Sequence, residues 1–411
     1  MIRRPTVPVV PLALTAGLLL ARVLAVPALG NPLGTPIGPS IRLEAPPLYM
    51  ALAPLFTTWD AVSMLPMSRL RGFLLGCLLL YAVWRAVRGR LRGTSWRRES
   101  ATAMLALSVL VAFIIGGLLW HRPMLALRGV PSGNAVVDFH SHTSVSHDVR
   151  GTLMRGFDAA ANRRWHRRAG FDAVFLTDHN TVVGQPRTPP VAPPWLCPGI
   201  EISAWRAHIV LLGDRAAVDH SRYNGSLDEL LALLQTSDAA YGALSVASLP
   251  EYERNHRDRL EALAAAGLDG IEIVNASPRA NEITAARRDS IIALARRNGL
   301  FVIGVSDSHG WGATNMVWNL VPVPAAPATV DPCRAILTRL RTGGVDAVTI
   351  VERHRLRAES GWPGWLTPIG ALWEAWRSMS PALASSWLLW IWGAWAARRA
   401  SIRASLTRPT R

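Results

Sequence analysis

The chain has 411 residues, 50% of them hydrophobic, with a net charge of +16, 17 tryptophans and three cysteines. This length exceeds a typical single domain and allows a full apolar core with segments left over. Three cysteines without a CxxC pair exclude a dense disulfide framework. The positive charge comes from arginine, which a GC-rich coding bias also produces. Many of these arginines flank apolar runs, so we expect a membrane rather than nucleic acid as the partner.

The first 120 residues contain three apolar runs. Residues 5–21 follow two arginines and could be a signal peptide or an anchor; without a clear cleavage site, an anchor near 5–27 is favoured. Residues 72–84 are apolar but too short to cross a bilayer by themselves. With the help of flanking residues, they predict a transmembrane span near 68–88. Residues 101–120 are uncharged and mostly apolar, enough for a helix to cross roughly 30 Å of hydrocarbon. We predict three spans here.

A fourth apolar run, rich in tryptophan, lies at 378–397 and ends at two arginines. Arginines also crowd residues 85–98, and such charge is retained on the cytoplasmic side of a membrane. With one span on each side of it, the central region is then extracytoplasmic, either periplasmic or on the outer face. The predicted division is a membrane region at 1–120, a central domain at 121–360, and an anchor with a basic tail at 361–411.

The sequence pattern of the central region is typical of an α/β domain. Short apolar stretches such as NAVVDF, DAVFLT, DGIEIVN and FVIGV predict buried strands, separated by helical patterns such as SLDELLALLQ. Their alternation indicates a parallel barrel or sheet, in which chemistry gathers at the carboxyl ends of strands. Cys197 and Cys333 fall in this region and could pair in an oxidising compartment, whereas Cys77 lies in an apolar run.

The stretch DFHSHTSVSHD, residues 138–148, places His140 and His142 at the end of a predicted strand. Side chains two residues apart on a strand point to one side, so both imidazoles can meet one ion. A solvated loop or a chance enrichment is the alternative. Three more strand ends, LTDHNT, GIEIS and GVSDSHG, carry His, Asp or Glu, and His208 follows GIEIS after a short turn. The candidate ligands there are His179, Glu201, His208, Asp307 and His309. This joint pattern predicts a site for zinc, manganese or iron.

The motifs HSHT, TDHN, GIEIS and VSDSHG, in this order over about residues 134–352, resemble the PHP superfamily of polymerase and histidinol phosphatase domains. The resemblance implies a distorted (β/α)7 barrel, two or three divalent metal ions and phosphoesterase activity. One ion would then be held by His140, His142, Asp307 and Glu201, with Glu201 bridging to a second ion that His208 also binds. His179 and His309 would hold a further ion, together with either His147 or Asp148, of which Asp148 is preferred.

This chain departs from the family pattern at SVASLPE. Relatives commonly carry a histidine directly before the proline, where this sequence has Leu249. The resemblance therefore implies one missing ligand for the second ion, for which His256 is a possible substitute. The chain would then bind two ions well and a third weakly.

We expect hydrolysis by metal-activated water, since no GxSxG elbow or catalytic-cysteine signature is present. Asp178 could orient His179 or move a proton, or simply cap a turn. Arg279 and Arg206 could hold a phosphate. The substrate would be a phosphorylated small molecule or a lipid-linked phosphate; the oligomeric state is not determined by the sequence. Two alternatives remain open, a metal-dependent hydrolase of another ester or an amide, and a non-catalytic sensor or scaffold.

Overall fold

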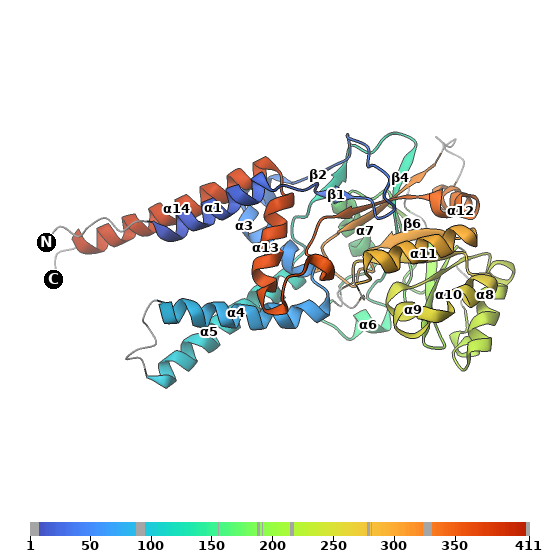
Figure 1. Cartoon of the computed structure of the whole chain (residues 1–411). Helices are drawn as coiled ribbons and strands as arrows, with labels where there is room; N and C mark the ends of the chain where they lie inside the picture. Colours follow the sequence, from blue (N-terminus) through green and yellow to red (C-terminus); the bar gives the residue numbers. More distant parts are fainter. Residues whose placement is uncertain are drawn as a thin grey trace.

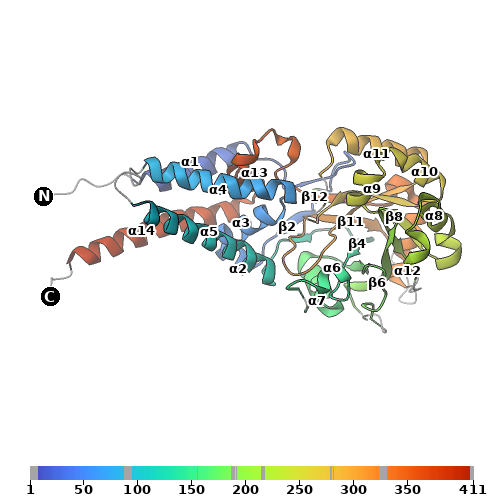
Figure 2. The same cartoon turned by 90° about the horizontal axis from the view of Figure 1, so that it is seen from below.

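The computed structural model describes residues 8–87, 95–154, 156–186, 190, 192–213, 218–277, 280, 282–323 and 331–407. Figure 1 shows an α/β body from which long helices project on one side. Figure 2, turned by 90°, shows the same arrangement, so the projection is a feature of the molecule and not of one view. The helices of this extension and of its junction with the body are α1 Val9–Val23, α2 Pro47–Ala51, α3 Ala53–Ser63, α4 Met67–Val87, α5 Trp96–Leu119, α13 Thr367–Ser378 and α14 Pro381–Thr407.

The body contains one curled sheet of ten strands. In spatial order these are β1 Leu29–Gly30, β12 Thr349–Arg353, β11 Val317–Pro322, β4 Asn134–Ser141, β5 Ala173–Leu176, β6 Trp195–Ala204, β7 Ala207–Leu212, β8 Leu244–Ala247, β9 Gly270–Asn275 and β10 Phe301–Val305. A separate pair joins β2 Arg42–Glu44 to β3 Ala126–Arg128. Residues 29–30, before the first long apolar helix pair, thus contribute an edge strand to the body.

The sheet is mixed, unlike the parallel barrel suggested by the sequence. Strands β4, β5 and β6 run parallel, as do β8, β9 and β10. The pairs of β7 with both neighbours, and of β11 with β4 and β12, are antiparallel. The curl brings the end of β10 back to β4, where the amide of Asp307 donates to the carbonyl of His140. The α/β class is therefore observed, in the form of a curled mixed half-barrel.

Helices cover the body sheet and follow local signals in the sequence. Helix α8 Leu227–Tyr241, for example, begins after Ser226, whose hydroxyl accepts from the amide of Glu229, and ends at Gly242 with φ 60°. The other body helices are α6 His147–Arg150, α7 Ala159–Ala169, α9 Leu249–Asn255, α10 Leu260–Ala265, α11 Ala285–Arg297 and α12 Pro332–Gly343. Short 3₁₀ turns lie at η1 His220–Tyr223, η2 Arg257–Arg259, η3 Gly344–Ala347, η4 Ala358–Ser360 and η5 Gly364–Leu366.

The main apolar core lies between the sheet and these helices. Leu233 of α8, Ile291 of α11 and Ile336 of α12 are fully buried against strand residues such as Val246. Cys197 of β6 and Cys333 of α12, 136 residues apart, form a disulfide across this layer. The pairing considered from the sequence is thus present, while Cys77 is a free thiol in α4.

Among the described residues, two helices, α4 and α5, are long and apolar enough to cross a membrane. They correspond to the runs predicted near 68–88 and 101–120. Helix α1, in the run predicted near 5–27, is apolar but has only 15 residues. The run at 378–397 lies in α14, whose tryptophans, serines and arginines reduce its hydropathy, and its span stays a prediction. Arg88, Arg90 and Arg92, used for the predicted orientation, lie outside the described residues.

A buried ion network joins the extension to the body. Asp60 of α3 accepts from Arg122 at 3.2 Å and from Arg353 of β12 at 3.1 Å, and each of the three residues is at most 8% exposed. Tyr49 of α2 donates a further hydrogen bond of 2.8 Å to the same carboxylate. Because one carboxylate is shared by two buried guanidinium groups and a tyrosine, the network fixes α2 and α3 against the sheet.

Candidate metal centre

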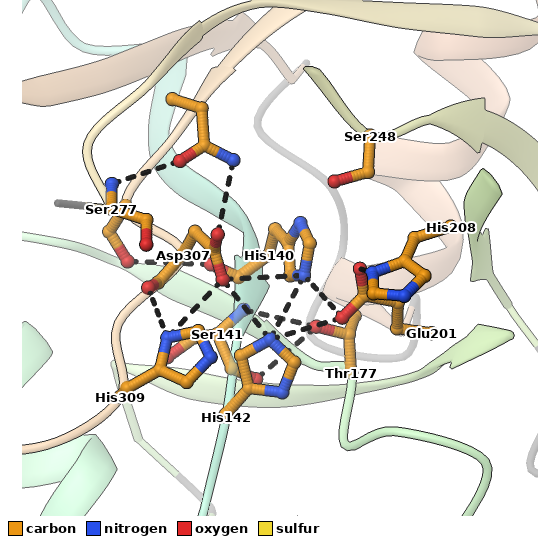
Figure 3. A network of polar contacts seen from close by, with 12 residues as sticks. His140, Ser141, His142, Thr177, Glu201, His208, Ser248, Ser277, Asp307 and His309 are labelled. Carbon is orange, nitrogen blue, oxygen red and sulfur yellow. Dashed lines mark hydrogen bonds and ion pairs between the residues drawn. The ribbon is translucent and has the colours of Figure 1, made fainter. Parts of the chain in front are cut away.

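Two imidazoles and a carboxylate meet where β4 and β10 end. His140 and His142 are buried, and their Nε2 atoms lie 3.0 Å apart. Asp307, directly after β10 and Ser306, places Oδ1 at 3.2 Å from His142 Nε2 and 3.6 Å from His140 Nε2. Asp307 has φ 44°, a left-handed conformation that costs free energy for a residue with a side chain. Despite this cost in free energy, the conformation directs the carboxylate toward both imidazoles (Figure 3).

Glu201 of β6 lies at the centre of the cluster. Its Oε2 is 3.1 Å from Nε2 of His140, 3.3 Å from that of His142 and 3.2 Å from that of His179. Its Oε1 is 3.0 Å from His208 Nδ1. Figure 3 shows Glu201 between the His140 and His142 side and His208. One carboxylate thus faces imidazoles on both sides, which is the arrangement that bridging two ions requires.

The side chain that lies beside both His179 and His309 is Asp148, and not His147. Asp148 Oδ2 is 2.5 Å from His309 Nε2 and 3.4 Å from His179 Nε2. The side chain of His147 is exposed, and its ring lies beside that of His179 at a centroid distance of 4.7 Å. Of the two residues considered from the sequence, Asp148 is the one that lies in a donor group, and its role as a ligand stays a prediction.

The structure brings all eight predicted ligands together in three overlapping groups. Within each group the potential ligand atoms lie within 4.8 Å of one another. The groups are His140, His142 and Asp307; His142, Asp148, His179 and His309; and His179, Glu201 and His208. His142 and His179 belong to two groups each, so the three groups form one continuous cluster.

The chemistry of these atoms fits divalent cations. Asp307 Oδ1 is buried without a hydrogen-bond partner, although three imidazoles surround it. A buried carboxylate oxygen without a partner is costly, and a cation among these donors would satisfy it. His140 and His309 each have Nδ1 engaged elsewhere, on Glu272 at 2.7 Å and on the carbonyl of Asp307 at 2.7 Å, which leaves Nε2 directed into the cluster.

The pKa values of the clustered side chains also indicate that the carboxylates are ionised and lie beside positive charge. Burial would raise the pKa of Glu201, but the surrounding imidazoles lower it well below its usual range. Burial lowers the pKa of His142, yet the neighbouring carboxylates of Asp307 and Glu201 raise it to about 10. The Asp148 pKa is likewise lowered, because hydrogen bonds from His179 and His309 outweigh burial. The carboxylates therefore remain ionised and are balanced either by protons on imidazole or by metal ions.

Glu272 is a functional residue that the sequence reasoning missed. It is fully buried on β9, accepts from His140, and also accepts from the amide of Leu249 at 2.9 Å and from Asn275 Nδ2 at 3.0 Å. A carboxylate behind a ligating imidazole fixes the ring and increases its basicity. The signal was available, because GIEI occurs twice, at 199–202 with Glu201 and at 270–273 with Glu272.

The departure at Leu249 is partly offset by a neighbouring carboxylate. Leu249 is buried in the apolar core at the start of α9. Two residues later, Glu251 places Oε2 at 3.6 Å from His208 Nδ1. Burial, with the charges of Glu201, Asp307 and Glu272, raises the Glu251 pKa to about 7, although His208 opposes this. His256, the substitute considered from the sequence, instead hydrogen-bonds the carbonyl of Trp205 and lies outside the three groups.

The other predicted catalytic residues have different surroundings. Asp178 accepts from the amide and hydroxyl of Thr143 at 2.6 and 2.8 Å, so it ties the HSHT turn to the end of β5 and does not hold His179. This is the turn-stabilising alternative. Arg206 is exposed and stacks over Trp205, with its guanidinium carbon 5.9 Å from the ring centre. Arg279 lies outside the described residues.

No family model matches this sequence, and no curated protein matches it. Three solved structures are similar to parts of the chain. A candidate metal-dependent phosphoesterase from Bifidobacterium adolescentis is 20% identical over 44% of this chain and 89% of its own, with a TM-score of 0.32. PsfC from Pseudomonas syringae is 19% identical over 58% and 96%, with a TM-score of 0.38. An amidohydrolase from Chromobacterium violaceum is 18% identical over 42% and 87%, with a TM-score of 0.27. TM-scores this low leave the family of the chain unassigned.

Proposed function

We propose that this protein is a membrane-anchored, metal-dependent phosphoesterase of the PHP type, which hydrolyses a phosphomonoester or a phosphodiester. The observation that carries the proposal is the convergence of eight imidazole and carboxylate side chains, seven from strands or strand ends and Asp148 from α6, into three overlapping groups. Two or three divalent ions, zinc, manganese or iron, fit such donors. The order of the motifs HSHT, TDHN, GIEIS and VSDSHG supports the PHP type and the phosphoester substrate.

The chain's own residues have definite tasks in this proposal. Glu201 links the groups, Glu272 orients His140, and the backbone bond from Asp307 to His140 keeps the ends of β10 and β4 in register. The chemistry that such ions supply when bound is activation of water and neutralisation of phosphoryl oxygens. The buried carboxylates Glu201 and Asp307 are ionised, as their lowered pKa values indicate, so a cation that displaces the imidazole protons finds two anionic donors in place.

The test uses the full-length protein in lipid nanodiscs. Hydrolysis of para-nitrophenyl phosphate, bis(para-nitrophenyl) phosphate and para-nitrophenyl acetate is followed before and after chelation, and after metal is restored. We expect chelator-sensitive release from at least one phosphate ester. Turnover of the acetate alone would identify a different metal-dependent hydrolase. Metal-loaded protein that is inert toward all three esters would support a sensor or scaffold and would contradict the proposal.

We further propose that the body lies outside the cytoplasm. The projecting helices leave the body on one side (Figure 1), and arginines lie at their ends away from it, such as Arg85 of α4 and Arg398 and Arg399 of α14. Positive charge of this kind favours the cytoplasmic side. The Cys197–Cys333 disulfide fits an oxidising compartment.

Thiol labelling tests this placement. In a Cys77→Ser background, which removes the free cysteine, protein extracted under denaturing conditions is treated with maleimide before and after reduction. We expect labelling only after reduction, as the disulfide requires. In intact cells, a C-terminal epitope tag should become accessible to antibody only after the membrane is permeabilised. Free thiols together with an externally accessible tag would reverse the proposed orientation.

A further inference from the structure

A cavity of about 270 Å³ connects the metal-ligand cluster to the membrane-directed helices. At one end it is lined by Asp148, Asp307 and His309, which are all members of the donor groups. Elsewhere its walls come from α3, α4 and α5 and are mostly apolar. A site for a small, soluble phosphate ester has no need for such a wall.

The apolar wall comes from the two helices that are able to cross a membrane. Leu70 of α4 and Ile114 and Leu118 of α5 line the cavity. Leu118 and Met67, which also lines it, are 40% and 49% exposed, so the cavity continues to the outer surface of this helix pair. A hydrocarbon chain could therefore extend from the bilayer toward the metal ligands without crossing water.

The loop that carries Asp307 and His309 is fixed against α5. A Cβ on Gly312 would lie 2.6 Å from the Cα of Leu118, so only glycine allows this close approach. Arg122 donates to the carbonyls of Gly117 and Gly312, each at 3.2 Å, and is held in turn by Asp60. The position of the metal ligands relative to α5 is thus set by backbone contact and by a buried ion pair.

We infer that the substrate is an amphiphilic membrane lipid phosphate, with its phosphate at the metal ligands and its hydrocarbon chain in the cavity between α4 and α5. The end of the cavity that suits a headgroup is the one lined by Asp148, Asp307 and His309, because the donor groups there would hold the cations that bind a phosphate. The inference rests on the proposed phosphoesterase function and adds the class of substrate to it. Burial of each methylene from water stabilises the bound chain, so longer chains bind more tightly until the cavity is filled.

The first experiment compares chain lengths with full-length protein in nanodiscs. The substrates are ethyl and dodecyl phosphate, and the ethyl and dodecyl para-nitrophenyl phosphodiesters, so that either ester class is covered. We expect kcat/KM for the dodecyl ester to exceed that for the ethyl ester by at least about tenfold, which corresponds to burial of two or more methylenes. Equal values would overturn the inference.

The second experiment fills the cavity. Ile114→Trp and Leu70→Trp should each reduce the ratio of kcat/KM for the dodecyl ester to that for the ethyl ester by about tenfold. Val109→Trp is the matched control, because Val109 lies on the same helix α5 but is 61% exposed. This control should retain the preference.

The outcomes separate the two proposals. Absence of chelator-sensitive hydrolysis for every phosphate ester contradicts the phosphoesterase function itself. Hydrolysis that is indifferent to chain length, or a chain-length preference that survives both cavity-filling variants, leaves the phosphoesterase intact and contradicts the lipid substrate. A preference lost equally in Val109→Trp would point to an effect of the bilayer and would also overturn the assignment of the cavity.

Discussion

The body and the helical extension distribute their side chains in opposite ways. In the body, apolar residues such as Phe139 and Ile209 are fully buried, and the polar residues that are also buried converge on one another at the strand ends. In the extension, large apolar residues face outward, with Leu75, Leu105 and Val109 52%, 65% and 61% exposed. Water explains the first pattern, and the proposed membrane would explain the second. The cavity beside His309 is lined from both regions.

Removal of a ligand from the body should have the largest effect. His140→Ala or Asp307→Ala takes away one donor from the cluster and should reduce kcat by about a thousandfold or more, since bound metal contributes several kcal/mol to catalysis. Phosphate release and metal content by elemental analysis are the measurements. His220→Ala, which alters a histidine outside the three groups, should leave both unchanged. Near-normal turnover in both ligand variants would exclude the proposed site.

The junction between the two regions should be the next most sensitive place. Asp60→Ala leaves Arg122 and Arg353 buried without their carboxylate and should reduce the free energy of unfolding by about 3–5 kcal/mol. Denaturant titration of the protein in nanodiscs measures the change. Asp238→Ala, which removes an exposed partner of Arg341, should cost no more than about 1 kcal/mol. Similar losses in the two variants would mean that the network does not hold the regions together.

A moderate effect on metal affinity is expected at Glu272, which contacts the predicted ligand His140. Glu272→Ala releases the Nδ1 of His140 and should weaken metal binding by about 10–100-fold. Titration of the metal-free protein with Mn²⁺ or Zn²⁺ gives the affinity. Glu261→Ala changes an exposed glutamate that contacts Arg297 and serves as the control. Unchanged affinity in Glu272→Ala would show that His140 is oriented by other contacts.

The smallest effect should come from the edge of the cluster. Glu251→Ala removes a carboxylate 3.6 Å from His208 and should weaken only the most weakly bound ion, by about tenfold or less. Metal stoichiometry at limiting concentration is the readout, with Glu253→Ala, on the same helix, as the control. A loss of all bound metal would place Glu251 at the centre of the site instead.

The sequence allowed prediction of the α/β class and of the donors, because both depend on local pattern. Strand ends rich in imidazole and carboxylate pointed to His140, His142, His179, Glu201, His208, Asp307 and His309, and the resemblance to the PHP superfamily added Asp148; the structure places these eight residues in the three donor groups. The strand directions of β7, β8 and β11 could not be obtained in this way, since a buried apolar run reads the same in either direction. Glu272 and Glu251 were missed because their roles depend on contacts with His140 and His208 from distant segments.

The central claim is that the strand ends of the body form a metal centre. The most direct measurement is an anomalous difference map from crystals of the full-length protein loaded with Mn²⁺ or Zn²⁺. We expect two strong peaks and a weaker third, each among one of the three donor groups, with Glu201 between two of them. If the crystals are grown with the metal ion in the solution and the map shows no anomalous peak beside His140, His142, Glu201 and Asp307, the account is contradicted.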